Sequence, residues 1–251
     1  MSDYFLPSGH GVRFDWGPTG AKHLAREVSC LVVVDVLSFT TSVSVAVESG
    51  TRVIPCARRD GNAERFAKQQ GARLAVERRA VGPDSPWSLS PAALRRAPFT
   101  PSLVLPSPNG SAIAAAADGV AVVAGCLRNG DAVAEWLAER GYGTADRPVG
   151  VVAAGERWRD GSVRPALEDL LGAGAVIAAL RQAGLSSLSR EAEAAASAFE
   201  SSGDVAEAVR ESISGRELAA GGFADDVSIA TELNGCAVVP VLTDGAFTAS
   251  V

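Results

Sequence analysis

The stretch VVVDVLSFTTSVSVAVESG, residues 32–50, carries the signals that decide the fold. Three valines run into one aspartate, Asp35, a cluster of hydroxyl side chains follows, and the sequence then becomes amphipathic. A short β-branched run predicts a strand buried on both faces, and the amphipathic segment behind it predicts a helix. We therefore expect Asp35 at the end of a strand, with Ser38, Thr40 and Thr41 where the next helix begins.

The same alternation continues along the chain. Further strands are expected where short β-branched runs recur, at 31–36, 52–55, 103–105, 120–124, 149–153 and 237–242. Helices are expected in the alanine-rich segments between them, including 61–70, 131–140 and 165–182. Strands alternating with helices predict a layered α/β fold with a mixed, largely parallel sheet.

Two stretches interrupt this alternation. Residues 77–101 hold five prolines, together with Trp87, Leu89 and Leu94, whose apolar surface should fold onto the body of the protein. Residues 186–211 are rich in alanine, serine and glutamate, which predicts an exposed helical hairpin or cap. Because no internal repeat or change of composition marks a boundary, we expect residues 1–251 to form one domain.

Composition excludes several classes of function. The chain has 251 residues, 47% of them hydrophobic, which is enough for a substantial core. A net charge of -6 without a lysine or arginine block argues against nucleic acid as a partner. No signal peptide and no run of eighteen apolar residues is present, so no membrane partner is expected. Four cysteines without a C-x-x-C pair predict buried free thiols and a cytoplasmic location.

Asp35 lies where an α/β sheet normally binds ligands. Ligands gather outside the carboxyl ends of strands, where helix N-termini present amides that bind anions. Hydroxyls and amides after Asp35 could therefore hold a phosphate while its carboxylate binds a cation. The alternative, equally open at this point, is that Asp35 bonds its own loop and Ser38 caps the helix. Leu37 breaks the D-x-D phosphatase pattern, which makes a metal ligand the better functional interpretation than a phosphorylated nucleophile.

A second motif is SPNGSAIAAAADG, residues 107–119, behind the strand expected at 103–105. Asn109-Gly110 predicts a tight turn that tolerates positive φ, and Ser111 can cap the following helix. Asn109 offers a carbonyl to a metal or an amide to a phosphate, and the amides of the turn form an anion nest. An Asn-Gly turn is, however, usually only structural.

A third motif occupies residues 151–180, a strand, a polar loop and a helix whose first turn holds Glu168 and Asp169. Acids there normally just complement the helix dipole. The loop adds metal-binding oxygens and planar anion donors, at Glu156, Arg157, Arg159 and Arg164. The alternative is a solvated surface loop, which fits Arg159 better than Arg157.

Six segments follow one another along the chain: DVLSFTTS, PNGS, GCLRNGDAVAEWL, AAGERWRDG, LEDLLGAG and SGRELAAGGFADDVSIA. Taken in this order, they resemble the 2-phosphosulfolactate phosphatase family over nearly the whole chain. The resemblance implies a three-layer α/β/α fold. It also implies magnesium-dependent hydrolysis of a small acidic phosphate monoester such as 2-phosphosulfolactate, on the route to coenzyme M. A homo-oligomer, most simply a homodimer, is the general expectation.

The resemblance also implies which residues form the site. Those expected to line it are Asp35, Asn109, Glu168 and Asp169, and those expected near the phosphate are Thr40, Thr41, Gly110 and Ser111. We assign Asp35 and Asp169 to Mg²⁺, and Glu168 to the metal or to a water-orienting base. Weaker candidates are Glu156 and Asp226. Asp226 is weaker because it is expected in the first turn of a helix, where an acid can simply complement the helix dipole. His10 and His23 lie outside these motifs, so histidine-phosphatase chemistry is not expected.

The chain departs from the family mainly at expected substrate contacts. Where the family reads DVLRATTT, Ser38 and Phe39 stand here, so an expected arginine is missing. The family's Gly-Asn-Ser-Pro is here SLSP at 88–91, and its TTNGT is SPNGS at 107–111, which loses threonines. Arg157 and Arg164 are candidates to replace that arginine as substrate-binding residues. The departures leave an alternative function open, a catalytically impaired anion-binding or assembly protein on the same scaffold.

Overall fold

The structure, a computed structural model, describes residues 7–57, 61–117 and 119–250. Within them, one sheet contains nine strands. Their order is β1 (Val12–Trp16), β7 (Val149–Ala153), β2 (Cys30–Val34), β6 (Ala121–Gly125), β10 (Pro240–Thr243), β11 (Ala246–Ala249), β3 (Arg52–Cys56), β5 (Ser102–Pro106) and β4 (Arg73–Leu74). Two further strands, β8 (Glu156–Arg157) and β9 (Val163–Arg164), form a separate small hairpin.

The sheet consists of two parallel groups joined by a hairpin. Strands β1, β7, β2 and β6 are parallel, as are β3, β5 and β4. The C-terminal hairpin β10–β11 lies between the groups and pairs antiparallel with β6 and with β3. Three successive antiparallel pairings make the two groups run in opposite senses. The mixed, largely parallel sheet predicted from the sequence is confirmed.

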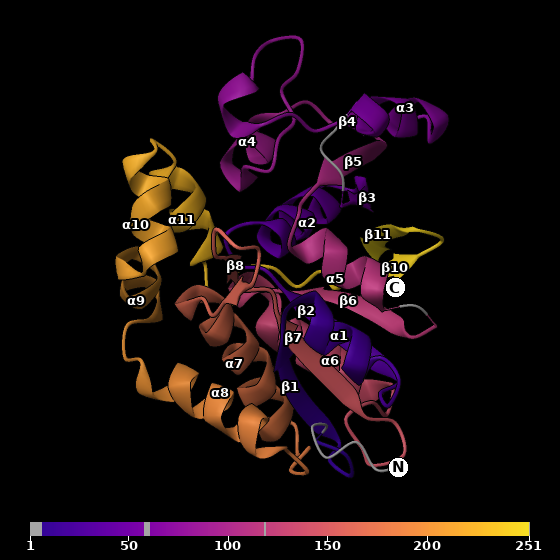
Figure 1. Cartoon of the computed structure of the whole chain (residues 1–251), viewed down its shortest axis with the longest axis vertical. Helices are drawn as coiled ribbons and strands as arrows, with labels where there is room; N and C mark the ends of the chain where they lie inside the picture. The colour runs from indigo at the N-terminus through magenta and orange to yellow at the C-terminus, as the bar shows by residue number, and fades with distance from the viewer. Residues whose placement is uncertain (1–6, 58–60, 118, 251) are drawn as a thin grey trace.

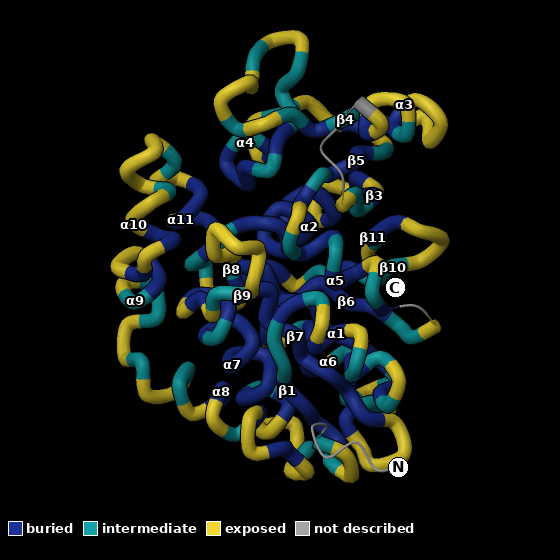
Figure 2. The backbone as a smooth tube through the Cα atoms, viewed as in Figure 1, coloured by how far each residue is buried: buried dark blue, intermediate teal, exposed yellow. Residues whose placement is uncertain are grey.

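Helices cover both faces of the sheet (Figures 1 and 2). The described helices are α1 (Gly17–Leu24), α2 (Phe39–Glu48), α3 (Gly61–Gln69), α4 (Pro91–Arg96), α5 (Gly110–Ala116), α6 (Gly130–Glu139), α7 (Leu167–Gln182), α8 (Arg190–Ser201), α9 (Val205–Glu211), α10 (Ile213–Ala220) and α11 (Ala224–Ala230). Two short 3₁₀ turns are η1 (Arg78–Ala80) and η2 (Leu127–Asn129).

Strand β2 shows why the fold has three layers. All five of its residues are buried, and they alternate between two hydrophobic cores. Val32 and Val34 face the core that includes α6, α7 and α8, whereas Leu31 and Val33 face the core that includes α1, α2 and α5. Successive strand side chains point to opposite faces, so a β-branched run buries both faces at once. The expected three-layer α/β/α arrangement is confirmed.

Helix α7 lies between the sheet and α8. It begins at Leu167, two residues later than predicted, because Pro165 precedes the helix and Ala166 is its N-cap. Gly172 allows close packing on the sheet, since a Cβ there would lie 2.5 Å from Cγ2 of Val36. Gly174 does the same toward α8, where a Cβ would lie 2.2 Å from the carbonyl oxygen of Ala195.

Both interrupting segments pack against the body. In residues 77–101, Leu94 is buried and Trp87 and Leu89 are half-buried against the core under α2. In residues 186–211, α8 packs along α7 and β1 with the alanines of one face buried. This corrects the expectation of an exposed hairpin or cap, because an alanine face allows α8 to approach α7 closely and complete the outer layer.

We expect Gly174→Ala to lower the free energy of unfolding. The added Cβ would meet a backbone oxygen of α8, and such overpacking costs roughly 1–3 kcal/mol, more than the gain of about 1 kcal/mol in helix propensity. Gly82→Ala is the matched control, because nothing lies within 4 Å of a Cβ at that position. Urea unfolding measures both variants, and a Gly174→Ala protein as stable as the wild type would contradict the packing described here.

Candidate active site

The segments that follow β2, β5 and β7 meet at one place. Asp35 follows β2, Gly110 opens α5 just after β5, and Gly155 lies just after β7. The backbone N–H of Gly110 donates to the carboxylate of Asp35, and those of Val36 and Gly155 donate to the carboxylate of Asp169. Three loops that are far apart in the sequence are thereby joined through two carboxylates.

Asp35 receives two amide hydrogens from two helices. Its Oδ1 accepts from the N–H of Phe39 at 3.1 Å and its Oδ2 from the N–H of Gly110 at 2.9 Å. These residues are the first of α2 and of α5, so two helix N-termini direct their amides at one carboxylate. The side chain is only 6% exposed, and burial raises the pKa of Asp35 in spite of these bonds.

Asp169 links β2 to β7. Its Oδ1 accepts from Val36 N–H at 2.7 Å, and its Oδ2 accepts from Gly155 N–H at 2.8 Å. Gly155 has a φ of +64°, a left-handed conformation that favours glycine and that turns its N–H to this carboxylate. Burial, followed by the charges of Asp35 and Glu168, raises the pKa of Asp169 well above its ordinary value.

Glu168 and Glu156 complete a cluster of four acids. Glu168 is 2% exposed, and its negative charge contributes to the raised pKa of each of the other three. Burial, with the charges of Asp35 and Glu168, raises the pKa of Glu156 to about 7. Like-charged carboxylates held together in this way are uncommon except at functional sites, and Glu156 can exchange a proton near neutral pH.

The β8–β9 hairpin orients Asn109 within the site. Asn109 Nδ2 donates to Glu156 Oε2 at 3.3 Å, and its Oδ1 accepts from Arg157 Nε at 3.1 Å. Both ends of the amide are thus fixed from one hairpin. The Arg164 guanidinium lies 5.7 Å from the centre of the Trp158 ring, and its positive charge partly offsets the rise in the pKa of Glu156. Arg159 is an exposed residue of the same hairpin.

The hydroxyls expected near a phosphate are engaged elsewhere. Thr40 is fully buried, and its Oγ1 donates to the carbonyl oxygen of Asp35 while accepting from the N–H of Asp35. Thr41 is also fully buried and donates to the carbonyl oxygen of Val36. Ser111, equally buried, donates to Leu105. These side chains hold the loops in shape, and their place near a phosphate stays a prediction.

Gly110 is required for a different reason from the one predicted. The turn does not use positive φ, since Asn109 has a φ of -98° and Gly110 is not among the described residues with positive φ. A Cβ on Gly110 would instead lie 2.3 Å from the Phe39 ring and 2.9 Å from Asp35 Oδ2. The glycine lets the backbone approach Phe39 and Asp35 closely, and its N–H donates to the carboxylate of Asp35.

Asp226 belongs to a neighbouring contact and not to the acid cluster. It is 1% exposed, and its Oδ2 accepts from Arg78 Nε at 2.9 Å while its Oδ1 accepts from Ala92 N–H at 3.1 Å and from Ser90 Oγ. Arg78 also donates from Nη2 to Ser38 Oγ, and its positive charge lowers the pKa of Asp35. No motif or spacing in the sequence marks Arg78 as a site residue.

The acid cluster has the ligand type that suits magnesium, but its carboxylates are not already arranged around a metal position. Carboxylate oxygens are the ligands Mg²⁺ prefers. In the described part of the chain, however, no group of three or more His, Cys, Asp or Glu side chains is arranged to hold a metal. The expected three-carboxylate site of Asp35, Asp169 and Glu168 is therefore not preformed. Mg²⁺ commonly uses one or two carboxylates with water and substrate phosphate, which this cluster can provide.

Comparisons with known proteins identify one family. The model of the 2-phosphosulpholactate phosphatase family matches residues 19–245, a span that includes all four acids of the cluster. A 2-phosphosulfolactate phosphatase of Methanothermobacter thermautotrophicus is 33% identical over 215 residues, which cover 85% of this chain and 87% of that protein. Among the described helices, none has the length and apolar character needed to cross a membrane.

We expect Glu156→Gln to change how stability depends on pH. Because the pKa of Glu156 rises from 4.5 to about 7 on folding, the stability linked to its proton is complete below pH 4.5 and is lost as pH rises through 7. Without divalent cations, the variant should exceed the wild type in unfolding free energy by on the order of 1–2 kcal/mol at pH 8, and by little at pH 4.

Denaturant unfolding at several pH values measures this difference. Glu135→Gln, an exposed acid on α6, is the control for loss of one negative charge. An identical pH dependence in the wild type and Glu156→Gln would show that Glu156 does not titrate as described.

Proposed function

The chain belongs to the 2-phosphosulfolactate phosphatase family, and we propose that it hydrolyses 2-phosphosulfolactate, or a closely related acidic phosphate monoester, with Mg²⁺. The observation that carries this proposal is the cluster formed by Asp35, Glu156, Glu168 and Asp169, in which burial and mutual repulsion raise the pKa of three members. Such a cluster needs a cation or protons to offset its charge, and a phosphatase uses both.

We assign the roles in the cluster by their surroundings. Both oxygens of Asp169 accept backbone N–H bonds, so its first role is to hold α7 to β2 and β7. Both oxygens of Asp35 also accept backbone N–H bonds, and each accepting oxygen keeps a second lone pair for a cation, so Asp35, Glu168 and Asp169 are all proposed carboxylates for Mg²⁺. When bound, Mg²⁺ neutralises charge on the phosphate oxygens.

Proton transfer is assigned to Glu156. Hydrolysis adds a water oxygen to phosphorus, breaks the ester P–O bond and requires a proton on the leaving alkoxide. A carboxyl group with a pKa of about 7 can donate that proton or accept one from the attacking water at neutral pH. Asn109, whose amide is fixed by Glu156 and Arg157, is proposed to orient the phosphate, with Arg157 and Arg164 at the outer edge of the site.

The alternative is a catalytically impaired protein that binds anions or assembles on this scaffold. The missing arginine at Ser38 and the loss of the family's threonines in residues 107–111 motivated that alternative. Two observations favour catalysis instead. They are the acid cluster and the 33% sequence identity to a phosphatase, which extends over most of both chains. Phosphate release from 2-phosphosulfolactate separates the two functions directly.

The setting of the reaction is also a proposal. We place it in the cytoplasm, on the route to coenzyme M, and in a homodimer. The buried thiols of Cys30, Cys126 and Cys236 support a reducing compartment, since none of them forms a disulfide. Analytical ultracentrifugation of the purified protein tests the oligomeric state.

We predict that Asp35→Asn lowers kcat for phosphate release on the order of a hundredfold, because the variant loses a charge proposed to hold Mg²⁺. The protein should still fold, with a lower Tm, since an asparagine NH₂ group replaces one acceptor of a backbone N–H. Circular dichroism checks the fold. Asp160→Asn, an exposed acid in the β8–β9 hairpin region, is the control and should retain wild-type activity. Full activity in Asp35→Asn would show that Asp35 does not have the proposed role in catalysis.

We predict that chelation abolishes activity and that millimolar Mg²⁺ restores it. Calorimetry should also detect Mg²⁺ binding to the wild type and weaker binding to Glu168→Gln, which loses one proposed carboxylate ligand. Activity that persists in EDTA after dialysis would argue against the metal while leaving the phosphatase assignment intact.

A further inference from the structure

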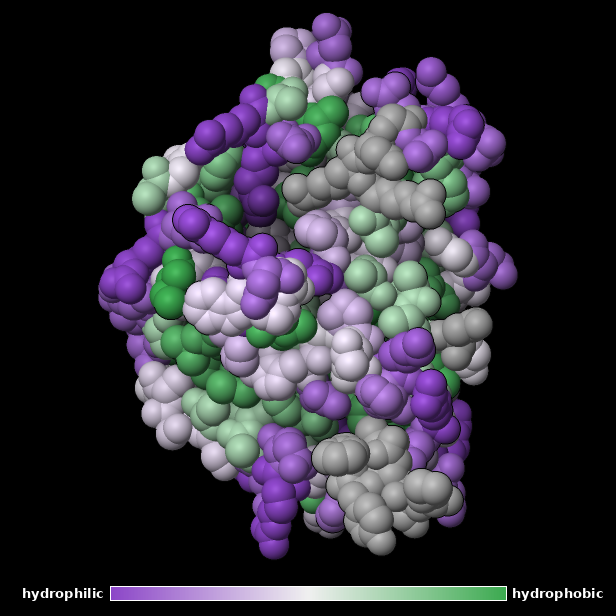
Figure 3. Space-filling view, in the orientation of Figure 1, coloured by the Kyte–Doolittle hydropathy of each residue, from purple (hydrophilic) through white to green (hydrophobic). Residues whose placement is uncertain are grey.

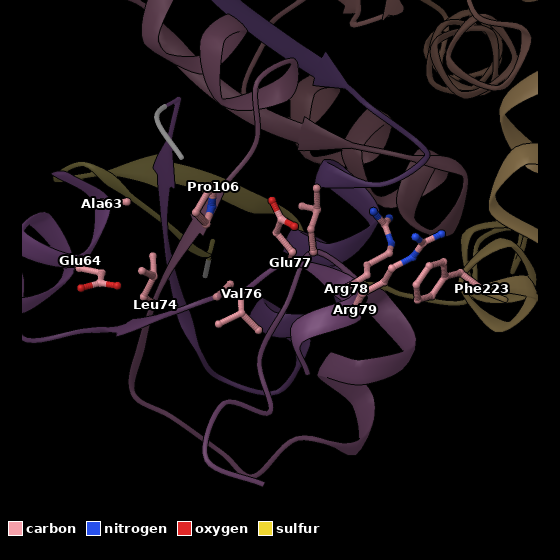
Figure 4. Close-up of a pocket in the computed structure, with 11 residues that line it drawn as sticks. Ala63, Glu64, Leu74, Val76, Glu77, Arg78, Arg79, Pro106 and Phe223 are labelled. Atoms are coloured by element: carbon pink, nitrogen blue, oxygen red, sulfur yellow. The ribbon is translucent and has the colours of Figure 1, made fainter. Parts of the chain in front are cut away.

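A pocket of about 460 Å³ lies between η1, α3, the end of β5 and the segment before α11. Residues that line it include Glu64, Val76, Arg78, Arg79, Pro106 and Phe223. Figure 4 shows Arg78, Arg79 and Phe223 together at one end and Glu64 beside α3 at the other. The pocket is large enough for a small ligand and carries its positive charge at one end.

This pocket adjoins the acid cluster. Arg78 donates to Ser38 Oγ, and the next residue, Phe39, donates its N–H to Asp35. On another wall, Pro106 ends β5, and the chain then reaches Gly110, whose N–H also donates to Asp35. The positive charge of Arg78 lowers the pKa of Asp35 as well. The arginine end of the pocket is therefore linked to the cluster through Ser38 and Phe39.

Arg78 is held in place by contacts from other parts of the chain. Its Nε donates to the buried carboxylate of Asp226, its Nη2 donates to Ser38, and its guanidinium lies 5.7 Å from the centre of the Phe223 ring. Asp226 is itself fixed by Ser90 and the N–H of Ala92. A guanidinium has five N–H groups, so these two bonds leave three that can meet an anion. An arginine fixed in this way loses little entropy when it binds a ligand.

We propose that this pocket binds the second acidic group of the phosphate monoester, a carboxylate or sulfonate, and that Arg78 makes the contact. Asp226 is a positioning residue that aims Arg78. The inference rests on the proposed phosphatase function and adds how the substrate is selected. It also explains the departure at Ser38, because a guanidinium from residues 77–101 lies against the side chain that stands where arginine was expected.

The test compares phosphate monoesters that carry different acidic groups besides the phosphate. The substrates are 2-phosphosulfolactate, which carries a carboxylate and a sulfonate, 2-phosphoglycolate, which carries a carboxylate, and ethyl phosphate, which carries neither. Arg78→Ala should lower kcat/KM about tenfold to hundredfold for the acidic esters, as expected for one lost charge-assisted bond. For ethyl phosphate the loss should be at least threefold smaller, because only the effect of the Arg78 charge on Asp35 remains there. An effect on 2-phosphoglycolate identifies the carboxylate as the bound group, and an effect limited to 2-phosphosulfolactate identifies the sulfonate.

Two further variants separate a role in binding from one in folding. Arg78→Lys retains a charge opposite Asp226 and should recover part of the loss, because lysine lacks the planar fork of arginine. Asp226→Asn should raise KM for the acidic esters and leave kcat nearly unchanged. Arg96→Ala is the matched control, since Arg96 lies in the same segment and forms an exposed pair with Asp225 at 3.5 Å. Its kcat/KM values should equal those of the wild type.

Binding of sulfolactate, measured by calorimetry, tests the pocket independently of catalysis. The wild type and Arg96→Ala should bind it, and Arg78→Ala should bind at least tenfold more weakly. An equal loss of kcat/KM on ethyl phosphate and the acidic esters would overturn the inference, as would unchanged sulfolactate binding in Arg78→Ala. A wild type that hydrolyses none of the three esters but binds sulfolactate through Arg78 would refute the phosphatase function and leave the pocket assigned.

Discussion

Two buried carboxylates that accept backbone N–H groups are the constraint on which the rest of the site depends. Asp35 accepts from the first residues of α2 and α5, and Asp169 accepts from the residues that follow β2 and β7. An unpaired buried N–H costs about as much as a lost hydrogen bond, so each bond stabilises the loop that donates it. Loops from distant parts of the chain are thus held in one arrangement.

The same bonds explain how the protein keeps four acids together. Burial and mutual repulsion oppose ionisation, and the pKa of Asp35, Asp169 and Glu156 rises for that reason. Backbone amides and Arg78 reduce the cost at Asp35 without removing it. The remaining imbalance suits a site that meets a cation and exchanges protons with a phosphate ester. The observed backbone bonds and the proposed chemistry therefore fall on the same carboxylates, so we expect removal of one of them to affect both fold and function.

The proposed selection of the substrate depends on a different part of the chain. Residues 77–101 pack against the core that includes α2, and the partly buried ion pair between Arg78 and Asp226 ties this segment to α11. A buried ion pair is weak evidence for stability, because desolvation offsets much of the attraction. Its geometry nevertheless fixes the direction of a guanidinium beside the acid cluster. The proposed chemistry thus resides in the loops after β2 and β7, while η1 contributes the arginines of the pocket proposed for a second acidic group.

The sequence by itself determined the elements and most of the acids. Strand, loop and helix in residues 32–50 follow from a β-branched run and its amphipathic continuation, and both are local signals. Placing Asp35, Glu168 and Asp169 at strand ends and helix starts needed no tertiary information. Strand β1 was missed because it contains charged side chains, among them Arg13, whose charge is met by Glu27 at 2.8 Å only in the folded protein.

Only the tertiary structure decided what those acids touch. Asp169 bonds an amide 133 residues away, Asp35 bonds one 75 residues away, and Arg78 pairs with Asp226 across 148 residues. Backbone N–H groups occur at every residue except proline, so no residue type in the sequence marks the ones that a carboxylate will accept. Burial is likewise a property of the packed molecule, and it shifts the pKa of Glu156 to about 7 and encloses the hydroxyls of Thr40 and Thr41. Local pattern specified the groups, and packing specified their partners and their charge.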